Sequence, residues 1–335
     1  MARTPATRVA ERTRRALQAV LAGDLEGAEA ELVELVQLDS GDPTAYMALA
    51  QLYRARGEVG RALQVHQNLL LRGDLSDDDR TRVQLALGDD LRRGGYRQRA
   101  IVAYRDVFEA NPHSPAARDA LVSLYAEDDQ PAQALAVIKE AAGWLGKRDT
   151  SREGPLLTQL AYQQRSEGRI DEARRTARRA IKRDASAACP FLLLGELELE
   201  RGRSKAALTA FKQAARLSNE DADALWLRVE TLYSASKHRD DFEAFVREHL
   251  ASAPGHRAAT RALARCVAAC GDVDGALLSL RGLLDADPRD DRSRAAFGRL
   301  LLADGRSTDA LKAYEDWIEV VAPAEPSLEL GEGSS

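Results

Sequence analysis

Aromatic residues are scarce in this sequence, and it contains no long apolar run. Phe, Trp and Tyr make up 5% of the 335 residues, whereas Ala, Leu, Arg, Asp and Glu dominate. Because these are mostly helix formers and β-branched residues are few, the composition predicts an all-α protein. No stretch approaches the roughly 18 consecutive apolar residues of a membrane-spanning helix. The basic start, residues 1–23, lacks the apolar core of a secretory signal, so we expect a cytoplasmic protein.

Cysteine is nearly absent, and charge of neither sign dominates. The three cysteines, Cys189, Cys266 and Cys270, are an odd number without framework spacing, which indicates free thiols in a reducing compartment. The net charge of −5 gives no global basic field, so nucleic acid is not an expected partner. No Gly-rich phosphate loop, nucleophile elbow or HExxH pattern occurs, and we expect neither catalysis nor a cofactor.

An internal repeat runs through the chain. In each copy an apolar helix and a short turn are followed by a small residue, then by a large apolar residue four positions later, and often by Pro. The nine copies, aligned on the small residue, centre on Ala28, Ala62, Ala100, Ala134, Ala173, Ala207, Phe242, Ala276 and Ala310. Their successive spacings are 34, 38, 34, 39, 34, 35, 34 and 34 residues. This pattern resembles the tetratricopeptide repeat, and the resemblance implies a right-handed α-solenoid of about nine helical hairpins.

The residue types of the repeat suit close packing of helices. In the clearest copy, residues 85–112, Gly88 lies in the first helix and Tyr104 in the second. Gly195 and Phe211 hold the same places in the sixth copy. A Gly removes a side chain where the two helices touch, and the ring fills the space between hairpins. One hairpin cannot bury its apolar face alone, so the copies must stack.

Two polar insertions interrupt the repeat array, and a polar segment lies at each of its ends. Residues 72–80 and 143–155 account for the longer spacings, and both are predicted loops. We expect residues 8–321 to form the repeat array. The first seven residues are predicted to be disordered, and residues 322–335, rich in Pro, Glu, Gly and Ser, a disordered acidic tail.

The second and third copies resemble one family more closely. Residues 48–101 contain RARGEVGRALQVHQ, a polar insertion, and a Gly-aromatic turn before the next Ala. This segment is similar to the lipopolysaccharide assembly protein B family, and the resemblance extends over roughly residues 12–320. It implies an adaptor of the bacterial inner membrane that presents the committed deacetylase of lipid A synthesis to a membrane-bound AAA+ zinc protease. The sequence shows no counterpart of the family's membrane helix or of its rubredoxin-like metal module.

A few isolated residues offer alternatives to pure protein binding. His66 stands where the repeat needs a large residue, so we expect a packed, hydrogen-bonded His rather than a ligand. Cys266 and Cys270, at i and i+4, could form half of a metal site. No second pair exists, so we expect two buried thiols and no metal. The run from Asp77 to Asp79 is predicted to be a solvated loop, since the spacing of a calcium loop is absent.

The predicted partner-binding surface lies on the first helices of the repeats, which the resemblance places along a concave groove. Its candidate residues are Met47, Gln51, Arg54, Arg82, Leu85, Asp89, Arg92, Arg93, Tyr162, Arg165, Leu192, Glu196 and Arg265, with Arg261 and Arg299 at further groove positions. Arg54, Arg92 and Arg93 could clamp an acidic peptide through paired Arg–carboxylate hydrogen bonds. The alternative is ordinary solvated Arg, because Arg is abundant throughout the chain.

A basic stripe lies on the second helix of the fifth copy, on its predicted convex face. It consists of Arg174, Arg175, Arg178, Arg179, Lys182 and Arg183. The two alternatives are a solvated outer face and docking on an anionic surface, at roughly 1 kcal/mol per basic residue. Docking on anionic lipid would place the protein at the periphery of the inner membrane.

Two functional hypotheses follow. The first is a non-catalytic adaptor whose groove holds a client protein, such as an envelope-synthesis enzyme, near a membrane protease, so that proximity raises their effective concentration. The second is a generic tetratricopeptide scaffold in another envelope, secretion or polysaccharide-export assembly. A clamp for chaperone tails is disfavoured because none of the three Asn residues holds a groove position.

Overall fold

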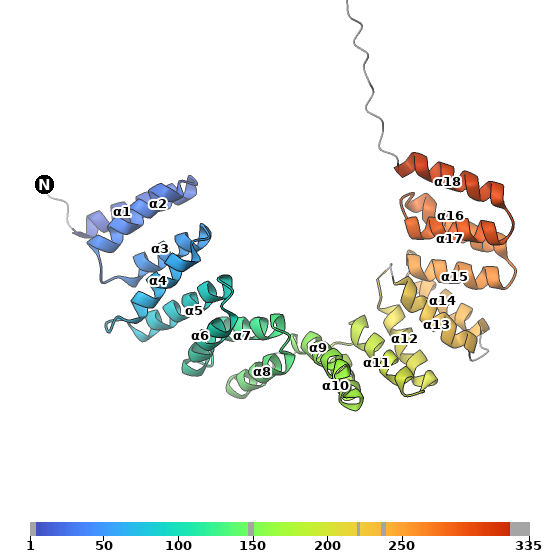
Figure 1. Cartoon of the computed structure of the whole chain (residues 1–335), viewed down its shortest axis with the longest axis horizontal. Coiled ribbons are helices and arrows are strands. Elements are labelled where there is room, and N and C mark those ends of the chain that lie inside the picture. Colours follow the sequence, from blue (N-terminus) through green and yellow to red (C-terminus); the bar gives the residue numbers. More distant parts are fainter. Residues whose placement is uncertain (1–4, 147–150, 220–221, 236–238, 322–335) are drawn as a thin grey trace, which may run out of the picture. The chain divides into compact units, whose positions relative to one another are not determined.

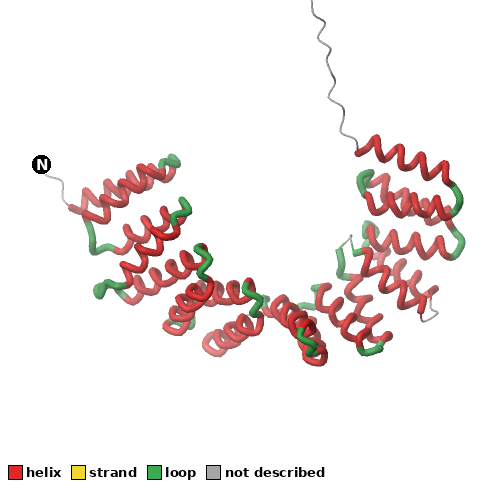
Figure 2. The backbone as a smooth tube through the Cα atoms, in the orientation of Figure 1, coloured by secondary structure: helices red, strands yellow, loops and turns green. Residues whose placement is uncertain are grey.

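The structure is a computed structural model that describes residues 5–146, 151–219, 222–235 and 239–321. Within these ranges the regular secondary structure consists of eighteen α-helices, with no strand (Figure 2). The helices are α1 (Pro5–Leu21), α2 (Leu25–Leu38), α3 (Pro43–Ala55), α4 (Val59–Leu70), α5 (Asp77–Arg93), α6 (Arg97–Ala110), α7 (Pro115–Glu127), α8 (Pro131–Leu145), α9 (Glu153–Ser166), α10 (Ile170–Arg183), α11 (Ala188–Glu200), α12 (Ser204–Arg216), α13 (Asp223–Ala235), α14 (Arg239–Ser252), α15 (Arg257–Ala269), α16 (Val273–Ala286), α17 (Asp291–Ala303) and α18 (Ser307–Val321). The all-α prediction is confirmed.

Two compact units divide the chain, Met1–Leu160 and Ala161–Ser335. Within each unit the helices pair as hairpins, and the hairpins stack in chain order (Figure 1). The nine predicted repeats correspond to nine helix pairs, from α1–α2 to α17–α18, among the described residues. The predicted α-solenoid is therefore confirmed as stacked hairpins, and the single array expected for residues 8–321 stays a prediction. The right-handed superhelix remains a prediction.

The small residue on which the repeats align is buried in every copy. All nine, from Ala28 to Ala310 and including Phe242, are 0–1% exposed. The Gly of the first helix is equally constrained, because a Cβ atom at Gly195 would lie 2.5 Å from the ring of Phe211. At Gly88 the corresponding distance, to the ring of Tyr104, is 2.7 Å. Each ring thus covers the Gly of its own hairpin, and this contact sets how closely the two helices approach.

The turns within hairpins depend on a residue in the left-handed conformation. Gly95, with φ +79°, ends the first helix of the third repeat, and the Tyr96 N–H donates to Leu91 O at 2.8 Å. Gly adopts this conformation without steric cost. In the fourth repeat Asp129 takes the same role at φ +53°.

The structure corrects the boundaries of three predicted segments. The acidic run from Asp77 to Asp79 is the first turn of α5 and not a loop, because the Ser76 side chain caps the helix by accepting from the Asp79 N–H. Acidic residues are favoured there by the helix dipole. The second insertion is helical up to Leu145 and again from Glu153, with residues 147–150 outside the described ranges. Residues 5–7, expected to be disordered, open α1, while residues 1–4 and the acidic tail 322–335 lie outside the described residues.

None of the helices in the described residues is both long and apolar enough to cross a membrane.

Candidate functional site

A hollow of about 710 Å³ on the first helices of the N-terminal unit gathers several predicted groove residues. Gln51 and Arg54 come from α3, and Asp89, Arg92 and Arg93 from α5. Leu124 and Glu127 of α7 complete the wall, with Ala55, Gly95 and Arg97. Five of the predicted groove residues, from the second and third repeats, therefore line the same hollow.

Arg54 belongs to a buried hydrogen-bond network inside this unit. Its Nε donates to Asp90 Oδ1 at 2.6 Å, and the other oxygen of that carboxylate, Oδ2, lies 2.6 Å from His66 Nδ1. Asp90 and His66 are almost fully buried, and Arg54 is largely covered. The network links α3, α4 and α5, and it confirms that His66 is packed and hydrogen-bonded.

Other arginines on the first helices pair with carboxylates of the neighbouring repeat. Arg92 donates to Glu127, and Arg265 donates to Glu230 at 3.1 Å, each pair 35 residues apart. Arg165 bonds to Glu196 and Glu200. Arg165 and Glu200 are also 35 residues apart, and because 35 is close to the repeat period, these three pairs join nearly equivalent positions of adjacent hairpins. Exposed pairs of this kind contribute about 0–1 kcal/mol each, so they fix alignment more than they stabilise.

These ion pairs reduce the number of arginines that could bind the carboxylates of an acidic peptide. Arg54 and Arg92 already hold carboxylates, whereas Arg93 donates only to Arg54 O, at 3.2 Å, among the described residues. Burial lowers the pKa of Arg165, but its hydrogen bonds to Glu200 and Glu196 outweigh burial and raise the pKa above its ordinary value. An acidic peptide would have to displace an internal carboxylate at most of these positions.

Several predicted groove residues do not line the hollow on α3, α5 and α7, nor the second hollow described below. Met47 and Leu85 are half-buried, and Leu85 packs against the core of the N-terminal unit. Arg82 is exposed and pairs with Asp79 of its own helix. Tyr162 is exposed on α9, and Leu192 is half-buried on α11.

A second hollow, of about 900 Å³, lies on the first helices of the C-terminal unit. Its floor is made of small and aliphatic side chains from α13, α15, α16 and α17: Ala224, Leu227, Ala264, Ala268, Leu280, Ala295, Ala296, Leu300 and Ala303. Arg265, Arg292 and Arg299 stand among them with the carboxylates Asp223 and Asp291. Arg265 donates to Glu230 at 3.1 Å, and Arg292 donates to Asp223 at 3.4 Å. Arg299 donates only to Ala295 O of its own helix, at 3.0 Å, among the described residues. The hollow thus has an apolar floor and a charged rim, in which arginines outnumber carboxylates.

Of the residues that line this second hollow, the sequence predicted Arg261, Arg265 and Arg299. All three line it, although Arg261 is only 2% exposed. Asp223 and Asp290 bind the Arg261 guanidinium inside the unit, so little of this side chain is open to a partner. The alanine floor was missed, although the first-helix spacing of Ala264 and Ala268 could have indicated it.

Some residues of the basic stripe on α10 pair with one buried carboxylate, and others remain exposed without an ion pair among the described residues. Glu198 of α11 accepts from Arg178 at 3.0 Å and from Arg174 at 3.5 Å, so these two cations are held in the structure. Arg175, Arg179 and Lys182 are exposed and make no ion pair among the described residues. Arg183, also exposed, has a partner of its own.

The cysteines differ from one another in exposure. Cys189, on the first turn of α11, is exposed, and Cys266 is buried. Cys270 is exposed, so the prediction of two buried thiols is wrong for this residue, which caps the end of α15 where the helix meets solvent.

Comparison with known proteins supports the repeat assignment. Residues 158–221, 192–254 and 239–291 match a tetratricopeptide repeat family model. Lipopolysaccharide assembly protein B of Escherichia coli K12 is 22% identical over 202 residues, which cover 60% of this chain and 52% of that protein. The chain thus spans about half the length of this relative.

Two solved structures of tetratricopeptide repeat proteins also align with the chain. One, from Parabacteroides merdae, is 15% identical with a TM-score of 0.41, covering 78% of this chain and 99% of the other. The other, YrrB, described as having an unusual peptide-binding site, is 18% identical with a TM-score of 0.40, covering 60% and 97%.

Proposed function

Because the chain carries tetratricopeptide repeats, a fold that typically binds proteins without catalysis, we propose that it is an adaptor which holds a client polypeptide in the hollow on α13, α15 and α17. The observation that carries the proposal is the floor of that hollow, where alanines leave space for a partner's large apolar side chain. Arg299 bonds to no carboxylate among the described residues, and it favours a client segment with an acidic residue beside its apolar anchor.

The similarity to lipopolysaccharide assembly protein B supports a finer version of this proposal. In that version the client is an envelope-synthesis enzyme, or the protease that degrades one, and the adaptor acts by raising their effective concentration. The relative matches over about half its length, so the client has to be established for this chain. The second candidate is a scaffold in another envelope, secretion or polysaccharide-export assembly.

Filling the hollow should abolish client binding. In Ala295→Trp the indole occupies the space above the alanine floor, and we expect at least about a tenfold loss of client, since a filled pocket cannot accept an anchor. Arg299→Glu should weaken the same contact by reversing a charge on the rim. The measurement is crosslinking in intact cells of the native host, followed by mass spectrometry of the captured proteins.

Leu311→Trp is the matched control, because Leu311 is exposed on α18 of the same unit and does not line the hollow. Equal recovery by wild type and Ala295→Trp would contradict the binding role of the hollow. If the protein lost from Ala295→Trp is an envelope-synthesis enzyme or membrane protease, the adaptor is supported. A secretion or export component would instead support the scaffold.

The exposed part of the basic stripe is proposed to touch an anionic membrane surface. Arg175, Arg179 and Lys182 contribute about 1 kcal/mol each near such a surface, so changing all three to Gln should weaken binding to vesicles with anionic lipid about a hundredfold. Vesicle flotation measures this. The control removes three exposed lysines from other second helices, Lys139, Lys205 and Lys312. Equal recovery on neutral and anionic vesicles would end the proposal.

A further inference from the structure

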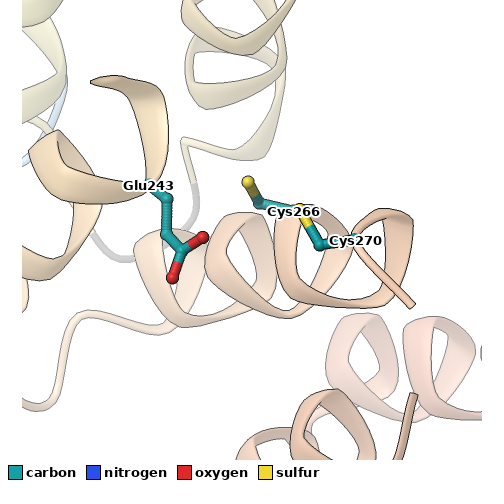
Figure 3. A group of neighbouring side chains, drawn as sticks. All are labelled: Glu243, Cys266 and Cys270. Atoms are coloured by element: carbon teal, nitrogen blue, oxygen red, sulfur yellow. The ribbon is translucent and has the colours of Figure 1, made fainter. Parts of the chain in front are cut away.

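Three metal-ligating side chains converge where α14 packs against α15 in the C-terminal unit. They are Glu243 of α14 and the pair Cys266 and Cys270 of α15, and Figure 3 shows the three side chains near one another, with Glu243 on one helix and both cysteines on another. One carboxylate oxygen and the two Sγ atoms all lie within 4.8 Å of each other. Sequence alone supplied the two thiols, and the fold brings the third ligand from a helix more than twenty residues earlier in the chain.

One ligand of the cluster is buried in the core, and the other two are accessible to solvent. Cys266 is 2% exposed and belongs to the core cluster that includes Phe242 and Val246 of α14, so its sulfur is held by packing. Cys270 is exposed, and the Glu243 side chain is 29% exposed. A cation can therefore reach the site from solvent while one of its ligands stays rigid.

We propose that Glu243, Cys266 and Cys270 form a binding site for a thiophilic divalent cation, with Zn²⁺ as the reference ion. Zinc accepts Cys sulfur at about 2.3 Å and carboxylate oxygen at about 2.0–2.2 Å, which separates tetrahedral ligand atoms by about 3.5–3.8 Å. The three atoms lie within 4.8 Å of one another, so they need to approach by no more than about 1.3 Å, which side-chain torsions allow. Two thiolates exclude Mg²⁺ and Ca²⁺ as the preferred ions, because those ions take oxygen ligands.

The charges around the cluster suit a bound dication. Arg247 Nε donates to Glu243 Oε1 at 2.8 Å, and Arg247 Nη2 lies 2.8 Å from the same oxygen, so Arg247 orients the carboxylate. Two thiolates and one carboxylate carry three negative charges, which Zn²⁺ and Arg247 together neutralise. Both cysteines lie at the C-terminal end of α15, where the helix dipole also favours a cation. Binding releases the thiol protons, so affinity falls as pH is lowered.

A bound cation would join the second helix of the seventh repeat to the first helix of the eighth. Only three ligands come from the described part of the chain, so one tetrahedral position is left for water or for a group from another molecule. The site thus resembles an open zinc site more than a closed structural one, and it would exist whether or not the adjacent hollow binds a client.

Cobalt provides the direct test, because Co²⁺ occupies zinc sites and its absorption reports thiolate ligands. The full chain, freed of metal by chelation and kept reduced, is titrated with Co²⁺ and then with Zn²⁺. We expect one Co²⁺ per chain with a thiolate-to-cobalt charge-transfer band that Zn²⁺ abolishes. Cys270→Ser should weaken binding at least about tenfold and reduce the band, since one of three protein ligands is lost. Glu243→Gln should weaken binding while leaving the thiolate band.

Cys189→Ser is the matched control, because Cys189 is an exposed thiol outside the cluster. Circular dichroism shows whether each variant folds, and the exposed Cys270 can be changed without opening the core. Zinc should also raise the thermal midpoint of the wild type but not that of Cys270→Ser. A wild type without a charge-transfer band, or a Cys189→Ser variant that loses as much as Cys270→Ser, would overturn the proposal.

Discussion

Replacing Arg261 with Leu should lower the free energy of unfolding of the C-terminal unit by about 3–5 kcal/mol, the cost of breaking a buried ionic network by removing one partner. Nε and Nη2 of Arg261 each donate to Asp223 at 2.8 Å. Nη1 donates to Asp290 Oδ2 at 3.1 Å and to Ser293 Oγ at 3.1 Å. Without Arg261, the Asp290 carboxylate stays buried beside Ser293 and loses its closest cation.

The pH dependence of this loss follows from the Asp290 carboxyl group. Burial raises its pKa, but the hydrogen bonds from Ser293 and the charges of Arg261 and Arg257 outweigh burial and lower the pKa below its usual value of 3.8. A carboxyl with a lowered folded pKa stabilises the fold above its unfolded pKa, and this contribution is lost as pH falls through the folded pKa. The difference between wild type and Arg261→Leu should therefore shrink as pH falls below the unfolded value of 3.8 and through the lower folded pKa of Asp290.

Urea unfolding followed by the fluorescence of Trp226, which is fully buried in the same unit, measures the loss. Arg299→Leu serves as the control, because Arg299 is exposed and bonds only to its own helix among the described residues. It should change stability by no more than about 0.5 kcal/mol. Equal effects of the two substitutions would show that the Arg261 network does not stabilise the unit.

The parts of the fold that sequence predicted are those encoded by local periodicity. A repeat of 34 residues with Ala, Gly and an aromatic ring at fixed places determines which helix faces are buried, and the nine aligned residues are all in the core. The start of α5 was missed although Ser76 followed by acidic residues is a helix N-terminal signal. That signal was outweighed by the polar, Gly-containing character of the insertion.

The candidate site was harder to predict because its properties depend on contacts between repeats. Arg54 and Arg261 both occupy first-helix positions, and nothing in their local sequence shows that Asp90 or Asp290 will hold them. An Arg that pairs with a residue about 35 positions away is found only by comparing equivalent positions of adjacent repeats. Glu243 was missed as a partner of Cys266 for the same reason, since α14 and α15 belong to different hairpins.

Phe211→Ala should be about as destabilising as Arg261→Leu, at about 3–5 kcal/mol, because truncating a buried Phe leaves a cavity as well as removing apolar contacts. Phe211 is 0% exposed and packs in one cluster with Trp226 of the next hairpin, whose fluorescence reports the loss. Tyr314 is the matched control. It covers Gly298 of its own hairpin in the same way, but it lies in the last hairpin and is 36% exposed. We expect Tyr314→Ala to cost less than half as much.

A second substitution at Gly195 separates ring packing from a general loss of apolar surface. Gly195→Ala alone should destabilise the unit by about 1–3 kcal/mol, since the new methyl would lie 2.5 Å from the Phe211 ring and force it out of place. In the Phe211→Ala background the ring is gone, and the same substitution should stabilise by up to about 1 kcal/mol, because Ala is the better helix former. If Gly195→Ala changes the free energy of unfolding with the same sign in both backgrounds, contact between Phe211 and Gly195 does not set the spacing of the two helices. The same explanation of helix packing in the other repeats would then also be wrong.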